Sequence, residues 1–182
     1  MTQINVYDGP SLNDPDILTT IDKWVTDDLT RQGSFSAGEC DLLADASGFT
    51  SGLDAVLQQA DAQGQTMFFS SGDAGSQCPA LTGVNGVPAG IPDTNYPASS
   101  PYGIGVGGTS ASAPSWQGIW ARVEGAHSGG ISFAGPVLYS TEPSTAFHDI
   151  TIGANGLYTA GPGYDLVTGL GTPDISKLIG GA

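Results

Sequence analysis

The sequence predicts an α/β domain in which helices cover a largely parallel sheet. Patterns typical of helices and of short apolar strands alternate along the chain, and glycine-rich turns follow the strands. Such alternation is typical of layered α/β folds. With 182 residues the chain can form one hydrophobic core, so we expect residues 1–182 to be a single domain. In such a sheet, functional residues lie in loops at the carboxyl ends of the strands.

The first part of the chain contributes two predicted helices and two predicted strands. Ile4–Tyr7 has the composition of a short strand. Apolar residues recur at helical spacing over residues 15–30. A second helix is expected over residues 51–63, with Gly64 as its stop signal, and a compact apolar strand over residues 66–70.

The second part of the chain has longer loops between its predicted elements. Residues 74–100 are rich in glycine and proline and predict a loop, which a short strand at residues 104–106 follows. A helix is expected over residues 112–123. Residues 147–171 read mostly as loop, and a last short helix is expected to begin at Thr172-Pro173.

Acidic residues dominate the charge of the chain. There are 18 Asp and Glu against 4 Lys and Arg, which gives a formal net charge of −14. Such a surface repels nucleic acid and anionic membranes, so we expect neither as a partner. It suits cation binding or activity in acid, although acidity can also serve solubility alone. The N-terminus lacks the pattern of a signal peptide, so either the natural protein is cytoplasmic or its leader lies outside this sequence.

Two cysteines, Cys40 and Cys78, permit one disulfide. Sequence alone does not show that they meet in space. Two free buried thiols are the alternative, and both readings stay open at this point.

One segment has the features of a nucleophilic serine turn. Residues 108–114 read GTSASAP, and they join the predicted strand 104–106 to the helix that follows. Small residues around Ser110 let a substrate backbone approach closely. Because Ser110 lies where the helix begins, unpaired backbone N–H groups face it and can stabilise an oxyanion. The alternative is a Gly/Ser/Ala loop without chemistry.

A serine hydroxyl needs a base, and the two histidines are poor candidates. His148 precedes Asp149 in a predicted loop, and His127 is expected in an exposed loop. The sequence therefore does not support a Ser-His-Asp triad.

Four segments of the chain carry a family resemblance. They read SSGDAG at residues 70–75, YPASSPY at 96–102, GTSASAP at 108–114, and FHDIT at 147–151 with GPGYD at 161–165 and GLGTP at 169–173. In this order they resemble the sedolisin family of serine-carboxyl peptidases. The resemblance implies a subtilisin-like three-layer fold, here reduced in size, and it favours secretion.

The resemblance also implies roles for individual residues. Ser110 would be the nucleophile, Asp73 would help to form the oxyanion hole, and a glutamate would replace histidine as general base. A carboxyl group donates a hydrogen bond only when it is protonated, which favours work in acid. The alternative for Asp73 is a turn-forming aspartate before a loop.

The chain departs from the family pattern in two places. The family carries its catalytic glutamate and a partner aspartate on an early helix, and nothing before Ser36 matches that helix. The long family insert before the nucleophile turn is also missing, so the chain looks internally deleted. Glu39, Asp41 and Asp45 are candidate substitutes, because Asp41 and Asp45 would share one face of a helix. Their position, however, matches a non-catalytic segment of the family beside Cys40.

A calcium site is expected near the C-terminal end of the chain. Calcium prefers oxygen ligands that mix carboxylates with backbone carbonyls. The resemblance implies that Asp149 and Asp165 bind through side chains, and that Ile150, Gly161 and Gly163 bind through carbonyls. An ordinary Gly/Asp turn cluster is the alternative.

These observations support three functional hypotheses. The first is an acid-acting, calcium-stabilised serine-carboxyl peptidase with Ser110 and Asp73 as its catalytic residues. The second is a non-catalytic calcium-binding remnant or binding domain, and the third is an esterase for activated or short esters. The expected partners are a peptide or ester substrate. A homodimer would cover apolar surface that an internal deletion exposes.

Overall fold

A three-stranded parallel sheet lies at the centre of the fold. The computed structural model describes residues 3–78, 91–128, 130–141 and 145–181. Its sheet has the order β1-β3-β5, where β1 is Gln32–Phe35, β3 is Thr66–Ser70 and β5 is Ile104–Val106. Both pairings are parallel, and Phe68 of β3 lies opposite Ile104 of β5. The predicted strands 66–70 and 104–106 are thus confirmed.

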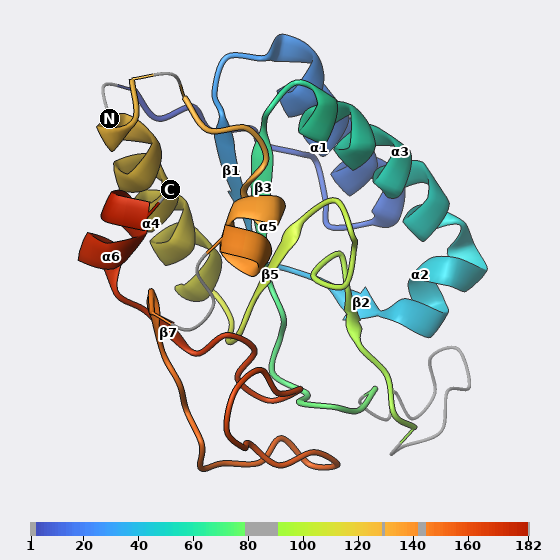
Figure 1. Ribbon diagram of the computed structural model, residues 1–182. Coiled ribbons are helices and arrows are strands. Elements are labelled where there is room, and N and C mark those ends of the chain that lie inside the picture. Colours follow the sequence, from blue (N-terminus) through green and yellow to red (C-terminus); the bar gives the residue numbers. More distant parts are fainter. Residues whose placement is uncertain (1–2, 79–90, 129, 142–144, 182) are drawn as a thin grey trace.

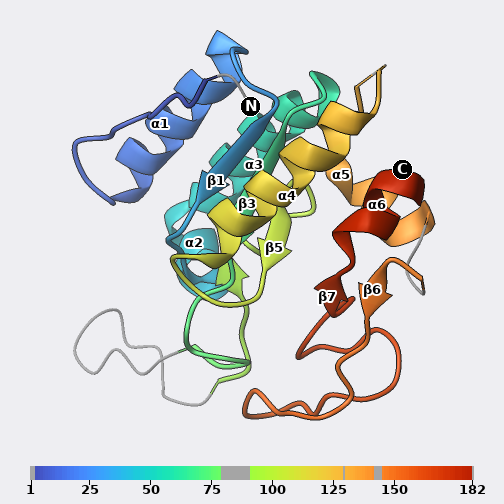
Figure 2. The same cartoon turned by 90° about the vertical axis from the view of Figure 1, so that its left-hand side faces the viewer.

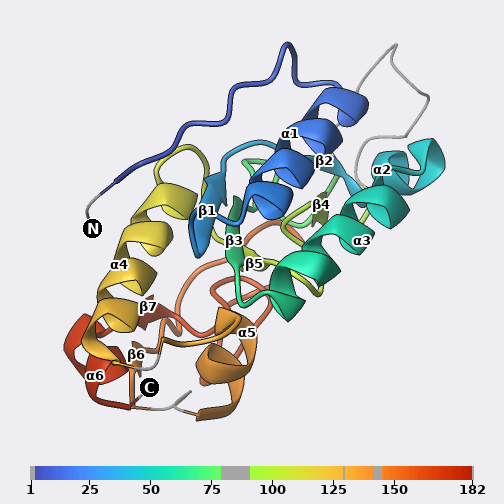
Figure 3. The same ribbon diagram turned by 90° about the horizontal axis from the view of Figure 1, so that it is seen from above.

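Helices cover both faces of this sheet (Figure 1). One layer holds α1 (Asp14–Asp27), α2 (Asp41–Ser47) and α3 (Phe49–Ala62). The other holds α4 (Ser112–Ala126) and α6 (Ile175–Gly181). In Figure 2 the layer with α4 and α6 faces the viewer, and Figure 3, seen from above, has α4 and α6 on one side of the strands and α1 and α3 on the other. The predicted three-layer α/β fold is therefore confirmed.

Strand β3 divides the hydrophobic core into two clusters. Side chains alternate between the faces of a strand. Met67 and Phe69 accordingly pack with α1 and α3, whereas Phe68 packs with Trp120 of α4. All five residues of β3 are buried, as expected for the central strand of a parallel sheet.

Short elements complete the described part of the chain. Strand β2 (Glu39–Cys40) pairs antiparallel with β4 (Asn95–Tyr96), and β6 (Phe147–His148) pairs antiparallel with β7 (Thr172–Pro173). Helix α5 (Ala134–Pro136) continues into a π-helical turn. No helix among the described residues has the length and apolar character that a bilayer crossing requires.

The predicted strand at Ile4–Tyr7 is wrong. This segment is extended but pairs with no other strand in the described ranges, and Ile4 and Val6 are 78% and 86% exposed. A strand composition alone does not supply a hydrogen-bonding partner. Strand β1 was not predicted, because its residues, QGSF, are weakly apolar, and the two-residue strands β2, β4, β6 and β7 were not predicted either.

Candidate active site

The carboxyl ends of β3 and β5 meet at one edge of the sheet. The amide of Ser71 donates to the carbonyl of Val106 at 2.8 Å, and the amide of Gly72 donates to the carbonyl of Gly108 at 3.2 Å. These bonds extend the pairing of the two strands into the loops beyond them. The structure therefore brings the loop that carries Asp73 alongside the turn that carries Ser110.

Ser110 lies in an exposed turn directly before α4. Gly108 has a φ of +101°, a conformation that favours glycine and starts the turn. The hydroxyl of Ser112 donates to the carbonyl of Thr109, and that of Ser115 donates to the carbonyl of Ala111. Within the described residues the hydroxyl of Ser110 has no hydrogen-bond partner. It is therefore the one serine hydroxyl of this turn that is available to a ligand.

The Asp73 loop is held from both sides. Asn95 donates from Nδ2 to the carbonyl of Ser71 at 3.0 Å. A Cβ at Gly72, whose φ is +83°, would lie 2.5 Å from that amide nitrogen, so only glycine fits there. On the other side, the amide of Ser76 donates to the carbonyl of Asn155 at 3.0 Å. The carboxyl group of Asp73 is exposed between these anchors.

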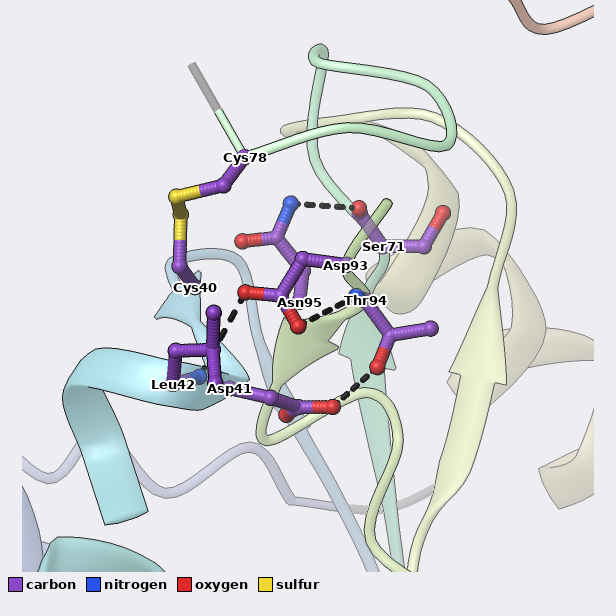
Figure 4. The surroundings of a disulfide bond; sticks show 8 residues. All are labelled: Cys40, Asp41, Leu42, Ser71, Cys78, Asp93, Thr94 and Asn95. Atoms are coloured by element: carbon purple, nitrogen blue, oxygen red, sulfur yellow. Dashed lines mark hydrogen bonds between the residues drawn. A yellow bond between two sulfur atoms is a disulfide. The ribbon is translucent and has the colours of Figure 1, made fainter. Parts of the chain in front are cut away.

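A disulfide lies behind this loop (Figure 4). Cys40 and Cys78 are bonded, with a Cα–Cα distance of 5.5 Å, which resolves the question that the sequence left open. Asp93 lies close to both sulfurs. Because the sulfurs are bonded to each other, they are not thiolate ligands for a metal. The bond ties the start of α2 to the chain that follows Asp73.

The candidate substitutes for the missing glutamate lie in β2 and α2. The stretch that holds Asp41 and Asp45 is helical, as that hypothesis requires. Asp41, however, accepts hydrogen bonds from the hydroxyls of Thr94 and Ser99. Burial raises the pKa of Glu39 above its ordinary value, and the neighbouring carboxylate of Asp14 adds to that rise. Among the described residues, no hydrogen bond joins any of the three to Ser110.

Among the described residues, neither histidine is hydrogen-bonded to Ser110 as a base would be. His127 ends α4, and its Nε2 lies 3.1 Å from the carbonyl oxygen of Ile179. At 1.5 Å per residue, it lies about 20 Å along the helix from the serine turn. His127 lies just after α4, outside regular structure, as expected, but it is half-buried rather than exposed. His148 belongs to β6 and is exposed.

The predicted calcium ligands all lie in the loop between β6 and β7. Asp165 accepts hydrogen bonds from the amides of Gly161 (3.0 Å), Val167 (2.8 Å) and Thr168 (2.8 Å). These backbone bonds, with that of Gly161 the strongest influence, lower the pKa of Asp165 to about 2. The carboxylate is therefore ionised across the pH range in which proteins work.

The rest of the predicted set belongs to the same hydrogen-bond network. Asp149 accepts from the amide of Gly163 at 2.8 Å, and the hydroxyl of Thr168 donates to the carbonyl of Ile150 at 3.3 Å. Gly163 has a φ of +81°, which turns the backbone sharply. The two carboxylates and the three carbonyls of the predicted set are all oxygen donors, the kind that calcium prefers.

Comparison with known proteins gives several relatives. Xanthomonalisin from Xanthomonas sp. (strain T-22) is 27% identical over 274 residues, which cover 92% of this chain and 33% of xanthomonalisin. Sedolisin from Pseudomonas sp. (strain 101) is 42% identical over 79 residues, and kumamolisin from Bacillus sp. (strain MN-32) is 40% identical over 80. These two matches cover 40% and 41% of this chain and 14% of each relative. No protein-family model matches the chain.

The fold agrees with these similarities. The solved structure of Pseudomonas sedolisin, described as a serine-carboxyl proteinase in complex with pseudo-iodotyrostatin, superimposes with a TM-score of 0.83 at 24% identity. The match covers 96% of this chain and 71% of that chain. The chain thus spans only a third of the length of xanthomonalisin, and an alignment of 274 residues over a chain of 182 leaves internal gaps. In sequence and in fold the chain is therefore similar to sedolisin-family peptidases, and it is shorter than the part of xanthomonalisin with which it aligns.

Proposed function

We propose that the chain is an acid-acting serine hydrolase of the serine-carboxyl type, with peptides as its substrate class. The observation that carries the proposal is the bridge between Gly72 and Gly108, which places the loops of Asp73 and Ser110 side by side. A free hydroxyl at the start of a helix and a carboxyl group in the neighbouring loop are the two groups that the reaction needs first.

In the proposed reaction, the Oγ of Ser110 attacks the carbonyl carbon of the substrate. Backbone N–H groups at the start of α4 and a protonated Asp73 donate hydrogen bonds to the oxyanion. A carboxylate takes the proton of the serine and passes it to the leaving amine. Water then hydrolyses the acyl-enzyme. The residue that takes this proton is not among the contacts of Ser110 in the described part of the chain.

We further propose that the loop between β6 and β7 binds calcium. Asp149 and Asp165 would bind through carboxylates, and Ile150, Gly161 and Gly163 through carbonyls. Calcium bound there would be structural, because it would hold a long loop that contains little regular structure. The all-oxygen donors and the ionised state of Asp165 support this proposal.

A fluorophosphonate probe tests the nucleophile directly. The protein is treated at about pH 4, near the pKa of an ordinary carboxyl group, and at about pH 7, well above that pKa. We expect labelling in acid that maps to Ser110, is lost in Ser110→Ala and persists in the matched control Ser112→Ala. No labelling of Ser110 at either pH would count decisively against an active nucleophile.

The absence of a carboxylate partner for the Ser110 hydroxyl, within the described residues, favours a second candidate. A calcium-stabilised binding domain would keep the fold without the base. It would show no labelling while retaining calcium-dependent stability. An esterase that lacks the base would be labelled, would turn over a short p-nitrophenyl ester in a Ser110-dependent way, and would leave casein intact.

A further inference from the structure

Strand β5 has an open edge. The sheet ends at β5, and among the described residues no strand pairs with the edge that faces away from β3. Gly105 is exposed in the middle of this strand, between the buried residues Ile104 and Val106. Figure 2 shows β5 at the side of the sheet, facing the β6–β7 pair across the molecule.

The pairing with β3 fixes which backbone groups of β5 face outward. The carbonyl of Val106 accepts a bond from the amide of Ser71, so Val106 directs its backbone toward β3. In a parallel ladder, successive residues direct their N–H and C=O groups to opposite sides. The N–H and C=O of Gly105 therefore point to the open edge. They have no hydrogen-bond partner within the residues that the structure describes.

A groove of about 780 Å³ runs along this edge. One wall is β5 with the loop before it, and the other is formed by residues 133–139 and 164–171. Tyr139 and Tyr164 form an edge-on aromatic pair on the far wall, with ring centroids 6.4 Å apart. Leu166, which is 61% exposed, lies on the same wall. The groove thus combines an unpaired backbone with large, accessible apolar side chains.

The charges on and around the groove restrict its ligand. Asp165 is the charged residue among those that line it, and the chain as a whole carries a formal charge of −14. An acidic ligand would be repelled, and a neutral or basic one would be favoured. An extended strand that added to this edge would satisfy the backbone groups of Gly105, and its side chains would face the tyrosines of the far wall.

We propose that this groove binds an extended, non-acidic peptide segment, which adds to β5 as a fourth strand of the sheet. The groove is also lined by Ser71, Val106 and Gly107, so it borders the loops of Asp73 and Ser110, but peptide binding there does not require Ser110 to react. The far wall includes Asp165 and its neighbours, so ordering of that loop by calcium would also order the groove.

The test uses Ser110→Ala protein, so that no peptide is cleaved. The probe is a blocked peptide in which lysine alternates with valine, and its comparison peptide has glutamate in place of lysine. Binding is measured by calorimetry, and exchange of the Gly105 amide is followed by NMR. We expect the lysine peptide alone to bind, and the Gly105 amide to exchange more slowly in the complex, because it has gained a hydrogen bond.

Substitutions in the wall locate the site. Gly105 itself is unsuitable, since a Cβ there would lie 2.4 Å from the carbonyl oxygen of Ala98. The exposed pair Tyr164→Ser and Leu166→Ser should weaken binding by about tenfold. Leu29→Ser removes an apolar group that is 67% exposed between α1 and β1 and does not line the groove, and it should change nothing.

Several results would overturn the proposal. They are no binding of the lysine peptide, stronger binding of the glutamate peptide, unchanged exchange at Gly105 in the complex, and equal binding by the wall variant and wild type. A dimer in which the Gly105 amide is already protected would also overturn it, because a second copy would then be the occupant.

Discussion

The amide of Gly72 donates a hydrogen bond to the carbonyl of Gly108 over 3.2 Å, and this contact joins the two loops that carry Asp73 and Ser110. Gly72 is one residue before Asp73, and Gly108 is two residues before Ser110. Because the bond is between backbone groups at the ends of paired strands, the relative position of the two loops depends on the sheet rather than on side chains. Substitutions at Asp73 can therefore be interpreted without expecting the loops to separate.

Two substitutions at Asp73 separate its proposed role from a turn-forming one. Asp73→Ala removes an oxyanion donor and is expected to lower kcat by about 10²–10³. Asp73→Asn keeps an N–H donor that needs no proton, so activity should extend further toward neutral pH. The measurement is the pH profile of kcat/KM for a peptide substrate. Equal, pH-independent losses in the two variants would indicate that Asp73 only shapes the turn.

Asp165 is expected to make stability depend on pH in acid. Its pKa falls from an ordinary 3.8 to about 2 in the folded protein, mainly through the bond from the amide of Gly161. A lowered folded pKa means that the stabilisation is present above about pH 4 and is lost as the pH falls through about 2. Asp165→Asn should therefore lower Tm at neutral pH and converge with wild type near pH 2. Parallel Tm curves for the two proteins would contradict this.

Calcium removal tests the metal proposal independently of activity. Thermal unfolding is followed with calcium and with chelator, and we expect calcium to raise Tm, because a ligand of the native state stabilises it. The shift should vanish in Asp149→Asn, while Asp93→Asn, which changes a carboxylate outside the loop, serves as the control. An unchanged midpoint in wild type would remove the calcium site.

The sequence predicted the central strands better than the edges of the fold. The run TMFFS at residues 66–70 is apolar throughout, and its bounds are those of β3. Strand β1, QGSF, has no such pattern. It lies at the edge of the sheet opposite β5, and an edge strand can carry small and polar residues. At Ile4–Tyr7 the composition suited a strand, but pairing depends on a partner that only the fold provides.

The candidate site was predictable to the extent that its groups are close in sequence or follow strands. Ser110 and Asp73 each follow a strand, so a parallel sheet brings them to one edge. The disulfide was not predictable, because Cys40 and Cys78 come together only through the pairing of β2 with β4. The free edge of β5 was equally hidden, since strand order is a property of the whole sheet.

Asp61 is expected to make the protein more stable in acid than at neutral pH. Burial raises its pKa from 3.8 to about 7, and its Oδ1 is buried without a hydrogen-bond partner among the described residues. A raised folded pKa means that its contribution is fully present below about pH 4 and is lost as the pH rises through about 7. Asp61→Asn should therefore raise Tm at neutral pH and leave it nearly unchanged near pH 3. An equal effect at both values would show that the carboxyl group does not titrate as expected.

Reduction of the disulfide is expected to destabilise the fold and to loosen the Asp73 loop. The bond joins residues 38 apart in the chain, and closing a loop of that size stabilises the native state by about 4 kcal/mol. Cys40→Ser with Cys78→Ser should lower the free energy of unfolding by that order, measured by urea denaturation. The same loss in wild type under reductant, with no further loss in the double variant, would assign the effect to the bond.

Since Gly72 and Asn95 also anchor the loop, labelling of Ser110 should survive where the protein remains folded. Loss of labelling in folded, reduced protein would instead show that the disulfide positions Asp73.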